Sequence, residues 1–447
     1  MLKSFYAAGL LSILVACSTP SKDYKKVIHN PVLYSKVTGH LTDVMTYDIF
    51  TPPVASRIYA YSHLAAYETM AHGDSSYTSL QGQLKGFDSV PEPPADSVID
   101  FPYASLMAFM EVGRTLTFSK DQTDKIVDSL RGLAESNGMP EDVMARSEAY
   151  GVKVGKRVMA WSKKDNYAQT RSAAKYTVPN EDGLWVPTPP GYIQAVEPQW
   201  RTIRTIAMDS SNQFPPPPPP RFSKDSTSEF YAWAKQVCDT IDNLTDEQKA
   251  IASFWDCNGF KLNVVGHTMF ATKAMTPGGH WMGITGIVCQ DKNADFNKTV
   301  YTYATLSFAL MDAFISCWDA KYTWNLVRPE TMINKHINPE WKPFLQTPPF
   351  PEYTSGHSEI SSACATVLEH IYGKEVAFRD STERGWGWPD RNFTSLRQAA
   401  DEAGMSRFYG GIHYRNSIFV AKEQGNKVGN NVLTKLKMKK EQQLAGK

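Results

Sequence analysis

The periodic spacing of apolar residues constrains the fold of this chain more than any other feature. In residues 358–373, apolar side chains fall at positions 360, 363, 364, 367, 368 and 371, which is the spacing of one face of an α-helix. Few stretches alternate between apolar and polar residues as a half-buried strand would. We therefore expect an all-α fold, a helical bundle built as one domain or as two packed helical halves.

The same spacing, together with capping signals, predicts further helices. They are expected at residues 57–70, 101–116, 119–138, 140–161, 226–241, 245–257, 262–274, 280–290, 296–318, 394–404 and 410–437. Gly151 and Gly155 are expected to be points of close helix packing. The six prolines at 215–220 cannot form a helix or an inner strand. We expect a stiff polyproline II spacer on the surface rather than a partner-binding motif.

The N-terminus has the features of an export signal. Lys3 supplies a positive charge, and residues 7–15 form an apolar run too short to span a bilayer. Leu14–Cys17 resembles a bacterial lipobox, so we expect cleavage before Cys17 and lipidation of its thiol. A plain secretory signal with a chance cysteine is the alternative.

These features predict how the chain is divided into segments and where in the cell the protein lies. The expected parts are a lipoprotein signal at 1–17, a tether at 18–27, a single helical domain at 28–440 with its active site within 318–413, and a polar tail at 441–447. The protein is expected to be an exported bacterial lipoprotein of the outer membrane or periplasm, held at the membrane by its lipid anchor only. The sequence leaves its oligomeric state open.

Charge and cysteine content exclude several classes of protein. The 447 residues carry a formal net charge of +1, which gives no basic footprint for nucleic acid. Five cysteines remain after Cys17, an odd number that cannot be fully paired within the chain. Cys317 and Cys364 lie on apolar helical stripes, so we expect buried free thiols. No CxxC spacing is present, which argues against a thiolate zinc site.

The segment Ser355–His357 leads into the clearest helix. The first N–H groups of a helix lack internal partners and carry partial positive charge, so an oxyanion can accept hydrogen bonds from them. Gly356 lets the backbone approach closely, Ser355 adds a hydroxyl donor, and His357 lies in the first turn. Taken alone, the segment also fits an ordinary Ser/Thr helix cap.

Two cations follow the long apolar helix at 296–318. Lys321 lies just past its end, and Arg328 precedes a proline, which favours an extended conformation at Arg328. The seven-residue offset is expected to bring both cations to one end of the helix. In isolation, a salt bridge of Arg328 with Glu330 or of Lys321 with Asp319 is the better explanation of these residues.

A third segment, Ser406–His413, holds Arg407 and His413 with Gly410–Gly411 between them. The glycine pair is expected to place His413 beside Arg407, although a single histidine in such a position is usually a hydrogen-bonded core residue. Together the three segments offer three cations, two imidazoles and a helix N-terminus. This inventory suits a tetrahedral oxyanion such as phosphate or vanadate.

The order Lys-x6-Arg-Pro, Ser-Gly-His, Ser-Arg-x3-Gly-x-His resembles the vanadium-dependent haloperoxidases and the type-2 phosphatidic acid phosphatase superfamily that shares their site. The segments at 254–260 and 276–281 and the length of the chain are similar to the haloperoxidase branch, and most similar to marine bacterial vanadium iodoperoxidases. Phe350, seven residues before the motif histidine, stands where chloro- and iodoperoxidases carry Phe. Trp318 and Phe260 look like pocket-wall residues of that subgroup, although plain core packing is the alternative.

The resemblance implies one vanadate(V) per chain, bound to a ring nitrogen of His413. The residues it implies around the vanadate oxygens are Lys321, Arg328, Ser355, Gly356, His357 and Arg407. His357 would handle protons at the apical oxygen, and Lys321 would polarise the O–O bond of the peroxide. Hydrogen peroxide and a halide would be the substrates and hypohalous acid the product. Iodide is expected first, since it is the easiest halide to oxidise, and bromide second.

Two positions depart from the family pattern. Thr354 stands where the family usually has Pro, a mild change because Thr can cap a helix. Ser417 stands where the phosphatases have an Asp that orients a nucleophilic histidine, which weakens the phosphatase interpretation and leaves open what holds the far nitrogen of His413. The alternatives are a lipid-anchored acid phosphatase, with His413 as nucleophile and His357 as general acid, and a non-catalytic oxyanion-binding lipoprotein.

Overall fold

The computed structural model describes residues 23–259, 261–271 and 273–440, and within them the fold is mostly helical. The first group of helices comprises α1 (Tyr24–Ile28), α2 (Pro31–Tyr47), α3 (Pro52–Gly73), α4 (Phe101–Leu116), α5 (Lys120–Ser136), α6 (Glu141–Ser162) and α7 (Tyr167–Ser172). The second comprises α8 (Glu229–Asp242), α9 (Asp246–Phe254), α10 (Pro277–Asp291), α11 (Phe296–Trp324), α12 (Pro329–His336), α13 (Gly356–Tyr372), α14 (Leu396–Tyr409) and α15 (Arg415–Lys435). Short 3₁₀ helices are η1 (Trp200–Thr202) and η2 (Thr382–Trp386).

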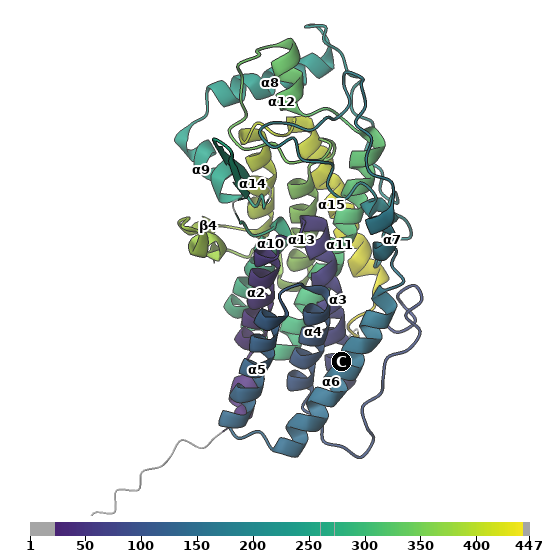
Figure 1. Cartoon of the computed structure of the whole chain (residues 1–447). Helices are drawn as coiled ribbons and strands as arrows, with labels where there is room; N and C mark the ends of the chain where they lie inside the picture. Colours follow the sequence, from purple (N-terminus) through teal and green to yellow (C-terminus); the bar gives the residue numbers. More distant parts are fainter. Residues whose placement is uncertain (1–22, 260, 272, 441–447) are drawn as a thin grey trace, which may run out of the picture.

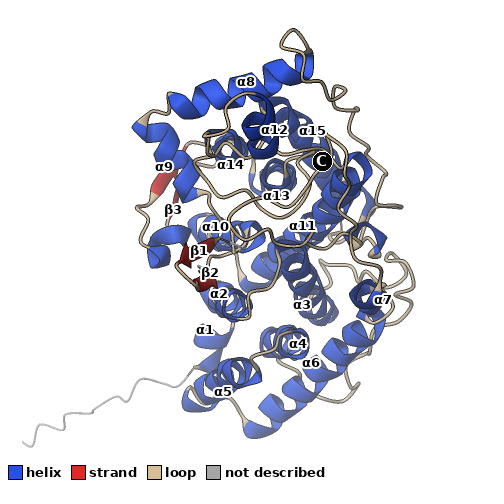
Figure 2. Ribbon diagram, turned by 45° about the horizontal axis from the view of Figure 1, so that its top comes forward, coloured by secondary structure: helices blue, strands red, loops and turns tan. Residues whose placement is uncertain are grey.

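The long helices run side by side, with α8 and α12 across one end of the bundle (Figure 1). Helix α11 packs against α3 on one side and against α13 and α15 on the other, as Figure 2 shows from above. By length and hydropathy, α11 is the one described helix that could cross a membrane, but 94% of its most apolar window is buried inside the protein. It is therefore the central helix of the core.

Apolar faces at helical spacing explain why these segments fold as they do. A continuous cluster of buried apolar side chains reaches from α2 and α3 through α11 to α13. Gly151 and Gly155 are confirmed as packing points, since a Cβ would lie 2.2 Å from the Ala104 carbonyl oxygen at the first and 2.9 Å from the Glu111 side chain at the second. The proline run at 215–220 lies at the surface without helix or strand.

One predicted helix is wrong. Within the predicted helix at 262–274, residues 262–271 form an antiparallel hairpin in which β1 (Leu262–Val265) pairs with β2 (Thr268–Ala271). Two consecutive β-branched valines favour an extended chain, and Gly266, with φ of +58°, makes the two-residue turn that a helix would not tolerate. A second small hairpin joins β3 (Phe378–Asp380) to β4 (Arg391–Phe393).

Candidate active site

The second and third motif segments line one pocket, and the first reaches it through Arg328, whose Nη1 lies 3.1 Å from Nε2 of His413. The C-terminal part of α11, the start of α13 and the link between α14 and α15 each contribute to its wall. The motif residues that line it are Gly356, His357, Arg407 and His413, and the aromatic wall includes Trp318 and Phe350. The ring centroids of Trp318 and Phe350 are 5.0 Å apart. The predicted wall residue Phe260 lies outside the described residues.

Lys321 is buried in the last turn of α11 and holds the loop that leads into α13. Its ammonium donates hydrogen bonds to the backbone oxygens of Pro351, Glu352 and Thr354, at 2.9, 3.0 and 2.6 Å. These three acceptors use all three donors of the ammonium, so the ion pair with Asp319 that was the alternative does not form among the described residues. Burial lowers the pKa of Lys321 to about 8, and the nearby Arg328 charge acts in the same direction.

Arg328 is also fully buried and is fixed by the loops on either side of the pocket. As the following proline predicts, it caps α12 in an extended conformation, with φ of −75° and ψ of 151°. Its Nε donates to the Phe350 carbonyl at 2.9 Å, and its Nη1 donates to the Ile412 carbonyl at 2.7 Å. Its Nη2 is buried and has no hydrogen-bond partner among the described residues.

A carboxylate that the sequence analysis missed orients His413. Nδ1 of His413 lies 2.8 Å from Oε1 of Glu352, which also accepts the Tyr414 N–H at 3.0 Å. The other oxygen of Glu352 accepts the hydroxyl of Ser417 at 2.8 Å. With its Nδ1 proton directed at the carboxylate, His413 carries its lone pair on Nε2, 3.1 Å from Nη1 of Arg328.

Glu352 is therefore the group that holds the far nitrogen of His413, which the serine at position 417 had left open. The carboxylate comes from the loop before α13, and Ser417 donates a hydrogen bond to it rather than supplying a carboxylate itself. Burial raises the pKa of Glu352 to about 7, while the cations Arg328 and Lys321 and the hydroxyl of Ser417 oppose that rise. Three donors on its two oxygens favour the ionised form that a neutral His413 requires as an anchor.

Arg407 completes the cationic side of the pocket. Its Nη1 donates to the Trp255 carbonyl at 2.7 Å, and its Nη2 lies 3.5 Å from Oδ1 of Asp256. Its Nε is buried without a partner in the described part of the chain. The predicted placement of His413 beside Arg407 is supported by their common position in the pocket wall.

His357 lies in the first turn of α13 and faces the same space. The Trp255 carbonyl forms a hydrogen bond with its ring, while Nε2 is buried with no partner within the described ranges. Ser355 is the N-cap of α13, and its side chain makes no capping hydrogen bond. Its hydroxyl instead accepts from Ser358 at 3.1 Å, so its own hydrogen remains available as a donor.

Both pocket histidines are neutral. Burial and the surrounding cations, Arg328 beside His413 and Arg407 beside His357, hold both pKa values well below the ordinary range. The pocket thus combines fixed positive charge with two uncharged imidazoles. Two buried guanidinium N–H groups without partners are costly unless an anion accepts them, so the donor set fits vanadate or another tetrahedral oxyanion.

Comparison with known proteins agrees with this geometry. A family profile described as the VCPO second helical-bundle domain matches residues 301–441. The crystal structure of the first bacterial vanadium-dependent iodoperoxidase is 45% identical, covers 93% of this chain and 99% of its own, and superposes with a TM-score of 0.88. The chain belongs to the vanadium-dependent haloperoxidases.

More distant structures share the fold. A bacterial vanadium-dependent chloroperoxidase is 17% identical in its holo and apo forms, with TM-scores of 0.66 and 0.65. These two cover 87% and 86% of this chain and 93% and 92% of their own. A search of curated proteins finds no match.

Proposed function

We propose that this haloperoxidase oxidises iodide with hydrogen peroxide and a proton to hypoiodous acid and water, with one vanadate per chain as cofactor. The observation that carries the proposal is the pair of buried guanidinium N–H groups, on Arg328 and Arg407, that lack partners in the described chain beside an uncharged His413. Iodide is proposed because the similar structure at 45% identity is an iodoperoxidase. Bromide is the second candidate halide.

The residues divide the work according to their contacts. His413 would hold the vanadium through Nε2, because its Nδ1 is fixed by Glu352. Arg328, Arg407 and the N-terminus of α13, with Ser355 and Gly356, would hold the oxygens. When bound, vanadate supplies a Lewis acid that activates peroxide towards the halide.

His357 is placed to handle the protons. Its Nε2 faces the pocket, and the Trp255 carbonyl holds the opposite side of the ring. A neutral imidazole in this position can take a proton from hydrogen peroxide and return it to the oxygen that leaves as water. Lys321 adds positive charge from behind the loop, while Trp318 and Phe350 form a wall that limits water.

An acid phosphatase is the second candidate function, because Glu352 gives His413 the carboxylate that a nucleophilic histidine needs. The test is one protein assayed in two states. Vanadate-loaded protein is expected to oxidise iodide only when peroxide is present, and apo protein is expected to turn over an aryl phosphate slowly or not at all. Rapid phosphatase turnover by the apo protein, with no peroxide-dependent iodide oxidation after loading, would assign the phosphatase instead.

We further propose that the chain is exported and lipidated at Cys17, as the lipobox-like segment supports. Cys17 and the signal segment lie outside the described residues. Mass spectrometry of the protein from a bacterial membrane fraction is expected to find a diacylated N-terminal Cys17. A soluble mature protein beginning at another residue would contradict this.

A further inference from the structure

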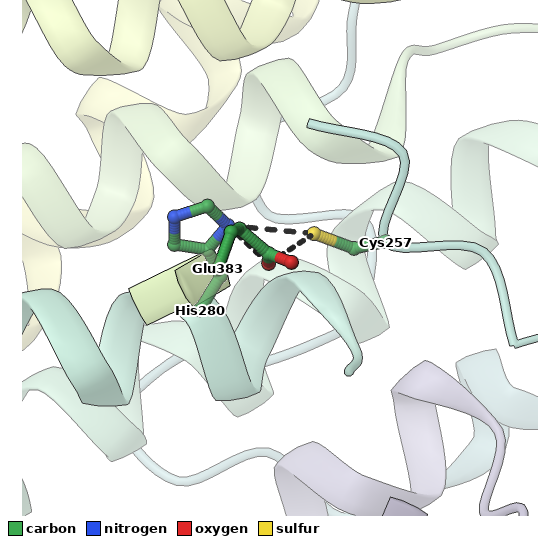
Figure 3. Close-up of side chains that lie close together, drawn as sticks. All are labelled: Cys257, His280 and Glu383. Carbon is green, nitrogen blue, oxygen red and sulfur yellow. Dashed lines mark hydrogen bonds and ion pairs between the residues drawn. The ribbon is translucent and has the colours of Figure 1, made fainter. Parts of the chain in front are cut away.

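Three buried side chains converge on one point beside the vanadate pocket, and none of them is a residue expected to hold the vanadate. Cys257 follows α9, His280 lies in the first turn of α10, and Glu383 belongs to η2 between β3 and β4 (Figure 3). The Cys257 sulfur lies 3.5 Å from Nδ1 of His280 and 3.9 Å from Oε1 of Glu383. Nδ1 of His280 lies 3.2 Å from the same Glu383 oxygen.

These separations are those of a tetrahedral metal site. Zinc bonds of about 2.3 Å to sulfur and about 2.0 Å to nitrogen and oxygen place tetrahedral ligands about 3.5 Å apart for S–N and S–O and about 3.3 Å for N–O. The observed values of 3.5, 3.9 and 3.2 Å follow this pattern. Thiolate, imidazole and carboxylate are also the ligand types that zinc prefers.

The outer contacts orient His280 as a metal ligand. Nε2 of His280 lies 2.8 Å from Oδ2 of Asp380, and the other oxygen of Asp380 is held by the backbone N–H and the hydroxyl of Thr382. His280 therefore donates its Nε2 proton to Asp380, and in the neutral ring the Nδ1 lone pair points at Cys257 and Glu383. A carboxylate behind a ligating histidine is the usual support of a zinc site.

We propose that Cys257, His280 and Glu383 bind a divalent zinc ion, with a water or another small ligand in the fourth position. The site would be structural. It would tie the segment between α9 and β1, the start of α10 and the β3–β4 connection to one another. A thiolate and a carboxylate balance the charge of one Zn²⁺, so the ion suits a buried position.

The ion would also brace the vanadate pocket. Two residues before Cys257, the Trp255 carbonyl accepts hydrogen bonds from both Arg407 and His357. The Trp255 ring stacks on His280, with centroids 4.4 Å apart and planes 19° apart. Cys257 itself lines the pocket. Fixing Cys257 therefore fixes the backbone that positions the two pocket residues.

Elemental analysis and cobalt substitution test the site. Protein purified without chelators is expected to contain about one zinc per chain, and to do so equally in a His413→Ala variant that lacks vanadium. After zinc is exchanged for Co²⁺, an intense near-ultraviolet band from thiolate-to-cobalt charge transfer is expected. A Cys257→Ser variant should lose this band. Cys289→Ser, which changes another buried thiol that is not part of this cluster, should keep it.

The alternative is an ion network in which His280 is a cation between Asp380 and Glu383. Wild-type protein with no bound divalent metal, and with no cobalt band after Co²⁺ addition, would establish that network and overturn the zinc site. Should Cys257→Ser not fold, Glu383→Gln is the second variant, and it is expected to bind less zinc than the wild type. The cobalt band of the wild-type protein tests the site without any variant.

Discussion

Two buried histidine sites lie on either side of one short segment, residues 255–257, and their electrostatics are opposite. His413 is surrounded by cations, and burial and Arg328 hold its pKa well below the ordinary range. His280 is just as buried, yet Asp380 and Glu383 raise its pKa well above the ordinary range against the effect of burial. Burial alone therefore does not define either site; the charge of the neighbours does.

This difference indicates which ligand each site accepts. The pocket of His413 leaves guanidinium N–H groups without partners among the described residues, so it calls for an anion. The cluster of His280 gathers a sulfur and carboxylate oxygens around one point, so it favours a cation, which is either the protonated imidazole itself or a metal ion in place of its Nδ1 proton. The Trp255 carbonyl and the neighbouring Cys257 link the two, because one holds Arg407 and the other belongs to the cluster.

Replacing the proposed vanadium ligand should have the largest effect. A His413→Ala variant is expected to lose vanadate binding and iodide oxidation together, with activity down by about 10³-fold or more. The exposed His370, on α13, offers a matched control, and His370→Ala should keep both properties. Vanadium analysis and a peroxide-dependent iodide assay on the same samples measure this. Retained oxidation in His413→Ala would show that another residue binds the metal.

Removing the anchor of the ligand should have the next largest effect. Glu352→Gln replaces a charged acceptor of the His413 Nδ1 proton by an amide, so the vanadate Kd is expected to rise by about 10- to 100-fold. Ser417→Ala removes only one donor to that carboxylate and should change the Kd less. Calorimetric titration with vanadate compares the variants. Equal vanadate affinity in Glu352→Gln and wild type would show that Glu352 does not anchor His413 for vanadate binding.

The charge of Lys321 should make vanadate binding depend on pH. With a pKa of about 8, Lys321 is charged below that pH and loses its proton above it, so vanadate affinity is expected to decline as pH rises through about 8. A bound anion shifts this midpoint upward, since it favours the charged ammonium. Titrations from pH 6.5 to 10 in wild type and Lys321→Met should show a shallower decline in the variant. If vanadate affinity fell with pH equally in both proteins, Lys321 would be excluded as the cause of the pH dependence.

His63 is another buried histidine, with neither kind of charge beside it, and it extends the comparison to stability. Burial lowers the pKa of His63 to about 3, and its Nδ1 is hydrogen-bonded to Tyr34 at 2.8 Å. Because the unfolded state takes up the proton first, stability is lost as pH falls below about 6.5, by up to about 1.4 kcal/mol per pH unit. His63→Phe should flatten this decline in denaturant unfolding between pH 6.5 and 4. An unchanged slope would exclude His63 as a contributor.

How far the sequence predicts this molecule depends on whether the signal is local. Helices such as α4 and α13 are predicted closely because apolar spacing within the segment decides them. The hairpin at 262–271 is not, because a short apolar run does not distinguish a helix from a strand without the turn at Gly266.

The sites follow the same rule. Lys321, Arg328, Arg407 and His413 are predicted because they occur in recognisable short motifs. Glu352 is missed since it lies in a loop, 61 residues from the imidazole that it holds. The zinc ligands are missed for a similar reason: residues 257, 280 and 383 share no short spacing, and the missing CxxC pattern pointed away from zinc.

A crystal structure of vanadate-soaked protein, with the vanadium located by anomalous scattering, tests the central claim most directly. We predict one vanadium per chain at bonding distance from Nε2 of His413, with its oxygens accepting hydrogen bonds from Arg328 and Arg407. Vanadium found elsewhere, or bound only through oxygen with His413 out of reach, would contradict the account.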